Sequence, residues 1–110
     1  MRDLSKLSDQ DINMRVAKIK FPELKYHAPK GVSCIDVLDG HHVQSYNWVF
    51  DEALAFRLMV DNIIDIDHLG GEGVRASHYA SDAFVDSMSD NPNRAIAECY
   101  ILMMEAADNE

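Results

Sequence analysis

The sequence, residues 1–110, predicts one α+β domain in which about three helices pack on a small, mainly antiparallel sheet. The length is that of a single domain, and a hydrophobic fraction of 47% is enough to bury a core. Apolar residues recur at helical spacing in three segments, and glycine-containing turns join the short β-prone runs between them. Helices that alternate with short hairpins are typical of α+β domains.

The first helix is expected over residues 8–20. Ser8 is a favoured N-cap, and Asp11 stands where a capping box ordinarily has Glu or Gln, so the box is imperfect. The apolar residues that follow repeat at i, i+4 and i+7, which is one helical face: Ile12, Val16 and Ile19. Pro22 ends the helical pattern.

A β-hairpin is expected next, because Asp39-Gly40 separates two β-prone runs at residues 32–38 and 41–46. With Asp39-Gly40 as a two-residue loop, the strands pair with Leu38 opposite His41 and Val37 opposite His42.

The second helix is predicted from about residue 50 to residue 62 and is apolar almost all round. Arg57 and Asp61 form its narrow polar stripe. Such a helix is expected to be buried on more than one side, either by the rest of the domain or by a second subunit. The protein is therefore expected to be a monomer or a homodimer.

The alternation at residues 64–67 predicts a half-buried strand, residues 69–73 a flexible connection, and residues 74–79 a returning strand. Residues 80–90 are ambiguous, with a short helical turn indicated by three apolar residues: Phe84, Val85 and Met88.

The closing helix begins after Asn91, a favoured cap, with Pro92 at the first helical position. Its apolar stripe is expected to be buried and consists of Ile96, Cys99, Tyr100, Met103 and Ala107.

Three segments, which together span nearly the whole chain, occur in the order found in one known protein family. The first is Leu7-Ser8-Asp9 with Ile12-Asn13 and Val16-Ala17, and the second is Asn47-Trp48 before Asn62-Ile63-Ile64. The third is Asn91-Pro92 with Arg94-Ala95 and Leu102-Met103-Met104. Together they resemble the NinX-like family of small bacteriophage proteins, although residues 20–45 and 68–90 match poorly. The resemblance implies a phage or prophage accessory protein with no catalytic residues to carry over.

Four residues within these segments are candidate interaction or structural positions: Asn47, Trp48, Asn91 and Arg94. A structural role is favoured for Asn47 and Trp48, with the indole ring packed in the core.

The formal net charge is −9, from 19 acidic and 10 basic residues, which argues against direct nucleic-acid binding through phosphates. The basic residues cluster early in the chain, and the remainder is strongly acidic. One interpretation is solubility through self-repulsion. The other is a surface that imitates DNA or docks on a basic host protein.

A cytoplasmic location in a bacterial host is expected. Two cysteines, Cys34 and Cys99, are too few for a disulfide framework. No signal-peptide pattern is present, and no apolar run approaches the ~20 residues that span a bilayer.

His41 and His42 suggest a metal site, with further ligands available elsewhere in the chain: His27, His68, Asp65 and Asp67. Adjacent residues of a strand point to opposite faces, so the pair is poorly placed to chelate one ion. The acidic and glycine-rich 65–73 loop fails the calcium-loop spacing and lacks the P-loop lysine. No cofactor is expected.

Nucleophilic catalysis would need a cysteine beside a base. Cys34 and His42 are expected on opposite faces of the hairpin, and Cys99 on the apolar stripe of the last helix is expected to be a core residue. The leading hypothesis is therefore a non-catalytic module that binds a host or phage protein. The alternative is a small enzyme or ligand- or metal-binding protein with a site near His41, His42 and the 65–73 loop.

Overall fold

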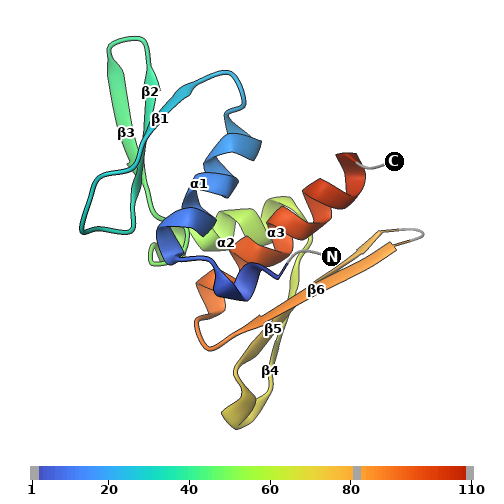
Figure 1. The fold of residues 1–110 in the computed structure, drawn as a ribbon. Helices are drawn as coiled ribbons and strands as arrows, with labels where there is room; N and C mark the ends of the chain where they lie inside the picture. Colours follow the sequence, from blue (N-terminus) through green and yellow to red (C-terminus); the bar gives the residue numbers. More distant parts are fainter. Residues whose placement is uncertain (1–2, 81–82, 109–110) are drawn as a thin grey trace.

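The computed structural model describes residues 3–80 and 83–108, and its helices and strands alternate along the chain (Figure 1). The helical elements are η1 (Leu4–Lys6), α1 (Asp9–Lys20), α2 (Glu52–Asp61), η2 (Gly70–Glu72) and α3 (Pro92–Asp108). The strands are β1 (Lys25–His27), β2 (Ile35–Asp39), β3 (His42–Tyr46), β4 (Asp65–His68), β5 (Val74–Ala80) and β6 (Ala83–Ser89).

The α+β class is confirmed, and in the described residues the strands divide between two antiparallel sheets. Sheet A has the order β1-β2-β3, and sheet B has the order β4-β5-β6. Figure 1 shows sheet A at one end of the molecule and sheet B at the other, with the three α-helices between them. α3 packs against β5 and β6 on one side and against α1 and α2 on others. The prediction of helices packed on a small antiparallel sheet thus holds for sheet B and α3.

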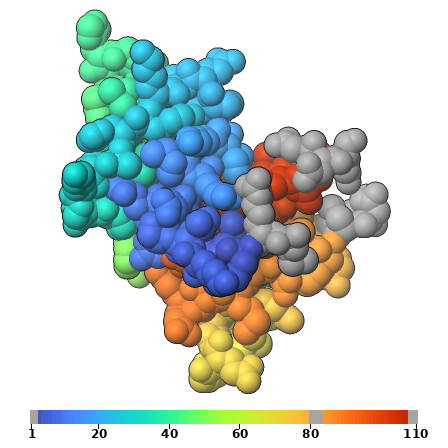
Figure 2. Space-filling model, in the orientation of Figure 1, coloured from blue at the N-terminus to red at the C-terminus, as the bar shows by residue number. Residues whose placement is uncertain are grey.

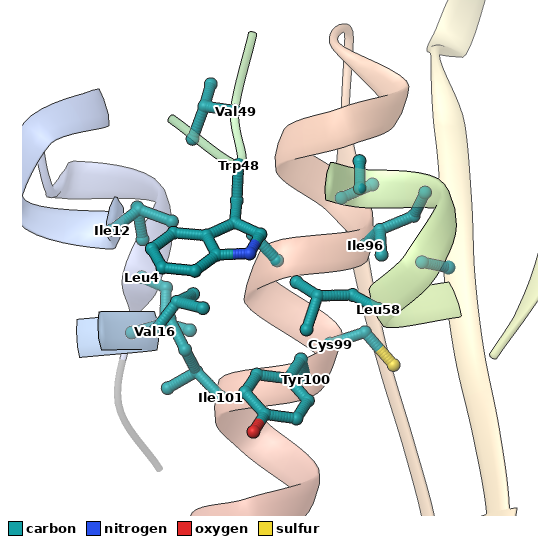
Figure 3. Packing of buried hydrophobic residues seen from close by; sticks show 14 of the residues in the cluster. Leu4, Ile12, Val16, Trp48, Val49, Leu58, Ile96, Cys99, Tyr100 and Ile101 are labelled. Carbon is teal, nitrogen blue, oxygen red and sulfur yellow. The ribbon is translucent and has the colours of Figure 1, made fainter. Parts of the chain in front are cut away.

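The hydrophobic core surrounds α3 and reaches α1 through Trp48, whose side chain is only 1% exposed (Figure 3). α3 is buried on most of its circumference over residues 95–101, which makes it the central element of the molecule. Ile96, Cys99 and Tyr100 are buried as expected. Ala107 is exposed, so its predicted burial is wrong: the last turn of α3 extends past the packed elements. None of the helices in the described residues is long and apolar enough to cross a membrane.

The predicted first helix is confirmed as α1, and its capping box is complete. The Asp11 backbone N–H donates to Ser8 Oγ at 3.1 Å, and the Ser8 backbone N–H donates to Asp11 Oδ2 at 3.4 Å. The shorter Asp side chain therefore closes the box, although at a longer distance than an ordinary hydrogen bond.

The hairpin of β2 and β3 is present, but its predicted pairing is wrong. Asp39 pairs with His42 and Leu38 with Val43, so the two loop residues are Gly40 and His41. Gly40 has φ 63, whereas His41 is not among the residues with positive φ. A turn whose first central residue alone has positive φ favours glycine at that position, and this moves the loop one residue along the chain.

Residues 83–89 form strand β6, so the helical turn suggested in this region is wrong. Its described side chains alternate along the strand, with Val85 and Ser87 half-buried and Phe84, Asp86 and Met88 exposed. The period of two was obscured because apolar residues occupy the exposed positions while a serine faces inward.

Gly73 is required by a close backbone approach between the 69–73 loop and the end of β6. It has φ 100 and ψ −150, a region open almost only to glycine. A Cβ at this position would lie 2.8 Å from the Ser89 carbonyl oxygen.

We expect Gly73→Ala to lower the free energy of unfolding by about 2–4 kcal/mol, measured by urea denaturation.

Gly71→Ala is the matched control, because a Cβ there meets no atom within 4 Å and its φ is not positive. This variant should stay within about 0.5 kcal/mol of the wild type. Equal effects at the two positions would contradict the structural role of Gly73.

Candidate functional site

Asn47 lies where β3 leads towards α2, and its side chain is held by polar groups from two other segments. Asn13 of α1 donates from Nδ2 to Asn47 Oδ1 at 2.8 Å and to the Ser33 carbonyl oxygen at 2.9 Å. Asn47 Nδ2 in turn donates to Ser33 Oγ at 2.9 Å. The Asn47 carbonyl accepts the backbone N–H groups of Phe50 and Asp51. Asn47 therefore orders the turn that precedes α2.

Val49 is hydrogen-bonded through its backbone to two asparagines from distant parts of the chain, one in α1 and one directly before α3. Its N–H donates to Asn13 Oδ1 at 3.2 Å, and its carbonyl accepts from Asn91 Nδ2 at 3.0 Å. Asn91 also caps α3, because its Oδ1 accepts from the backbone N–H groups of Asn93 and Arg94. The predicted cap is confirmed, and the same side chain ties the start of α3 to the segment before α2.

Trp48 sits between these two hydrogen-bonded residues with its ring in the core. The indole is stacked on Tyr46, with ring centroids 4.9 Å apart and planes 3° from parallel. Figure 3 shows the ring between α1 and α3, near Ile12 and Val16. The hydrogen bonds on either side fix the backbone, so the ring enters the core at one place.

Arg94, one turn into α3, fastens the N-terminal segment to that helix. Its Nη1 donates to Asp9 Oδ1 at 2.6 Å, and its Nη2 donates to the carbonyl oxygens of Leu4 at 2.9 Å and Leu7 at 2.7 Å. Its Nε donates to Glu98 Oε2 at 2.6 Å. Burial by itself would lower the pKa of Arg94, but the hydrogen bonds to Glu98 and Asp9 outweigh it and raise the pKa above its ordinary value.

Glu98 is 2% exposed and is the acidic partner that compensates Arg94 inside the fold. One of its oxygens bonds Arg94, and the other accepts a hydrogen bond from the Ser87 hydroxyl on β6. A buried carboxylate is tolerated only when it is paired and hydrogen-bonded in this way. The contact also joins sheet B to α3.

The structure thus brings the four candidate positions together around the starts of α1, α2 and α3, in contacts internal to the fold. The contacts given above hold segments together and place no reactive group at an open surface. Sequence reasoning missed the partners Asn13, Glu98 and Asp9. Asn13 and Glu98 each interrupt an apolar helical face, and this was the available signal, since a polar residue there needs a buried partner.

The 65–73 loop and the two adjacent histidines do not form one site. His41 and His42 are exposed at the tip of sheet A, whereas β4 and η2 lie at the far end of sheet B (Figure 1). No group of three or more His, Cys, Asp or Glu side chains that could hold a metal occurs in residues 3–80 and 83–108. The two histidines and the 65–73 loop therefore lie too far apart to share one site in the described residues.

The thiol of Cys99 is enclosed in the core, as expected for a small apolar residue. Burial, with a smaller contribution from the charge of Asp86, raises its pKa to about 12. At neutral pH it is a neutral thiol and a poor nucleophile. Cys34 precedes β2 and is half-buried, and its carbonyl accepts a hydrogen bond from Gln10.

An open hollow lies at the start of α2 and is lined by five residues: Asn47, Phe50, Asp51, Glu52 and Ala53. Its main polar groups are already engaged, since Asp51 caps α2 through the N–H groups of Ala53 and Leu54. The hollow is a shallow surface feature around a helix cap.

Charge is distributed unequally over the chain. Residues 1–50 contain seven Lys or Arg and six Asp or Glu, whereas residues 51–110 contain three and thirteen. The net charges of the two parts are therefore +1 and −10. The first part forms α1 and sheet A, and the second forms α2, sheet B and α3, so the net charge differs between the part of the chain that holds sheet A and the part that holds sheet B. Figure 2, coloured by residue number, shows where the two parts lie.

The side of sheet B that faces away from α3 combines acidic and apolar side chains with one cation, Arg75, which pairs with Asp67 at 3.3 Å. Ser87 reaches α3, so its neighbours on β6 point the other way, and pairing carries that face across β5 and β4. We call this surface the acidic sheet face and define it by six exposed residues: Asp65, Asp67, Tyr79, Phe84, Asp86 and Met88. Asp65 and Asp86 flank Ser77, and the rings of Tyr79 and Phe84 lie 4.5 Å apart.

One face of α2 is uncovered, so the expected burial on more than one side does not occur within residues 3–80 and 83–108. Ala55 and Leu58 face the core, while Phe56 is 61%, Val60 53% and Ile63 76% exposed. The last three residues, at spacing i, i+4 and i+7, are called the α2 stripe below.

Ile63 follows the end of α2 in a left-handed conformation, with φ 53. The Ile64 N–H donates to the Met59 carbonyl at 2.9 Å and the Ile63 N–H to the Val60 carbonyl at 3.5 Å, the pattern of a Schellman motif. Glycine is usual at this position, and a non-glycine residue there costs about 1–2 kcal/mol. Little burial within the chain offsets that cost.

No family model and no curated protein matches this sequence. The fold is similar to that of a phage protein from Bacillus cereus ATCC 14579, with a TM-score of 0.68 and 11% sequence identity. The likeness covers 96% of this chain and 94% of the Bacillus cereus chain. At this identity it shows a shared fold, and the resemblance to the NinX-like family has no matching family model behind it.

We expect Arg94→Lys to lower the free energy of unfolding by about 1.5–3 kcal/mol, because one ammonium group does not reproduce a fork that bonds four acceptors. Chemical denaturation of both proteins provides the measurement. Arg15→Lys is the control, since Arg15 makes a single 3.3 Å contact with Glu105 and should tolerate the change within about 0.5 kcal/mol.

Asn13→Ala should destabilise the fold by about 2–4 kcal/mol, because it deprives Val49 N–H, the Ser33 carbonyl and Asn47 Oδ1 of a shared partner. Urea denaturation followed by the fluorescence of Trp48 would report the loss. Gln44→Ala, on the exposed strand β3, should change stability by less than about 0.5 kcal/mol. A tolerated Asn13→Ala would show that the network does not anchor the Trp48 segment.

Proposed function

We propose that this chain is a small phage or prophage accessory protein that acts in the bacterial cytoplasm as a non-catalytic binding module, with a basic host or phage protein as its partner. The phage protein of similar fold supports the phage assignment, as does the sequence resemblance to the NinX-like family. The contacts of the candidate residues within the fold support binding over catalysis, because their polar groups serve the fold.

The observation that carries the proposal is the acidic sheet face. Asp65 and Asp86 stand on either side of the small residue Ser77, and Tyr79 and Phe84 form an exposed aromatic pair beside them. Carboxylates attract Lys and Arg side chains, and an aromatic face adds a cation–π contact. Exposed apolar area beside the charges gives a docked partner something to bury.

Electrostatic attraction of this kind sets the expected salt dependence. A partner drawn by the acidic surface should bind more weakly as salt is added, because exposed charges are screened over about 8 Å at physiological ionic strength. The affinity should also fall with salt if the surface imitates DNA. In that case the affinity should fall more steeply, because more charges are engaged.

The test is a pull-down from host lysate with tagged wild-type protein and two double variants, read by mass spectrometry at low and moderate salt. Asp65→Asn with Asp86→Asn removes two charges from the acidic sheet face. We expect a basic protein that is captured by the wild type, reduced at moderate salt, and lost with this variant.

Glu23→Gln with Asp39→Asn is the matched control, since it removes the same charge from exposed positions outside sheet B. This variant should capture the partner as the wild type does. Equal loss with both double variants would mean that net charge alone drives capture, and capture that persists at high salt would oppose the electrostatic mechanism.

A further inference from the structure

The α2 stripe is an exposed apolar surface that lies outside the acidic sheet face. It plays no part in the proposed capture of a basic partner. Phe56, Val60 and Ile63 line one side of a ten-residue helix whose opposite side packs on α3. Single exposed apolar residues are ordinary, but three at helical spacing form a continuous strip of the kind that a partner covers.

Ile63 strengthens this inference because its backbone is strained and its side chain is 76% exposed. Glycine would relieve the strain at the end of α2, so the isoleucine side chain is retained at a cost to the single chain. The Schellman hydrogen bonds and a 3.2 Å contact between His78 Nδ1 and the Ile63 carbonyl hold this turn, but they would serve glycine equally well. The exposed isoleucine side chain therefore points to a role outside the chain.

We propose that the α2 stripe is covered by the α2 stripe of a second copy of this chain, with the two helices antiparallel across a two-fold axis. Charge selects this occupant. Arg57 and Asp61 lie one turn apart beside the stripe, and the structure gives neither an ion pair within the described residues. An antiparallel arrangement sets each Arg57 on the same side of the interface as Asp61 of the second copy and within one residue of its level, and symmetry repeats the contact.

The same arrangement matches the apolar residues. A two-fold axis level with the midpoint between residues 59 and 60 brings Phe56 level with Ile63 of the second copy and places Val60 next to the axis. In this register Arg57 is level with Asn62, and Asp61 lies one residue, about 1.5 Å, further along the helix, within reach of the long Arg57 side chain. In a parallel pair Arg57 and Asp61 of one copy would instead lie on the opposite side of the interface from those of the other copy, so these ion pairs would not form. The exposed ion pairs choose the orientation, and burial of the stripe supplies the affinity.

Salt separates this contact from the binding of a basic partner. Each copy carries a net charge of −9, so two copies repel each other at long range. Added salt screens that repulsion while the apolar stripe stays buried, so dimerisation should strengthen with moderate salt. Capture of a basic partner should weaken over the same range, so the two contacts can fail independently.

The experiment is sedimentation equilibrium on the full chain over a range of concentrations and salt. We expect the wild type to form dimers that dissociate on dilution. Ile63→Gly should weaken dimerisation at least tenfold, yet raise the melting temperature of the dilute, monomeric protein by about 3 °C because backbone strain is removed. If Ile63 served only the fold, the substitution would not weaken dimerisation while it stabilises the monomer.

Tyr79→Ser is the control, because Tyr79 is as exposed as Ile63 but lies on the acidic sheet face. It should leave dimerisation unchanged. Arg57→Asp and Asp61→Arg should each weaken the dimer, and the double exchange should restore it, since a two-fold contact re-forms both ion pairs with reversed polarity.

Three results would overturn the proposal. A wild type that stays monomeric at all concentrations would leave the stripe to a foreign protein or to solvent. An unchanged dimer in Ile63→Gly would place the interface elsewhere. Failure of the double exchange to rescue would exclude the antiparallel arrangement.

Discussion

The fold depends on how the Asn47-Trp48-Val49 segment is fixed. Asn13 and Asn91 hydrogen-bond to its two ends, and the indole between them enters the core at 1% exposure. Without these bonds, a buried segment outside any strand would leave backbone polar groups unpaired, at a cost of about 1–3 kcal/mol each. The anchored segment links sheet A to α2, and it thereby sets where the two ends of the molecule lie.

A second polar contact fixes the other side of α3. Arg94 donates hydrogen bonds to Leu4, Leu7 and Asp9 of the N-terminal segment. Glu98 accepts a hydrogen bond from Ser87 of β6. Charged side chains near a core are costly unless they are fully paired. Because both members of this pair have several partners, α3 is held in one orientation between the N-terminal segment and sheet B.

These internal contacts account for Asn13, Trp48, Asn91, Arg94 and Glu98, whereas the acidic sheet face and the α2 stripe remain on the surface. The acidic sheet face and the α2 stripe are distinct in position and in chemistry. One carries carboxylates beside aromatic rings, and the other is apolar with one charge of each sign. The two proposed contacts therefore call for different occupants, and we expect them to respond to ionic strength in opposite directions.

The sequence by itself determined the local structure. Ser8 and Asn91 cap their helices as predicted, and the apolar period placed α1, α2 and α3 as well as β4 and β5, because capping and periodicity depend on neighbours along the chain. It did not locate β6, whose apolar side chains face outward, or the turn at Gly40-His41. It singled out Asn47, Trp48, Asn91 and Arg94, but it could not show that their partners are Asn13, Asp9 and Glu98.

Only the tertiary structure decided which face of α2 is covered, and which side of sheet B is open. Both depend on contacts between segments far apart in sequence, whose geometry no local pattern encodes. A helix that is apolar on most sides gives the same periodic signal whether one face or two are buried. The packing of α3 covers one of those faces and leaves the α2 stripe exposed.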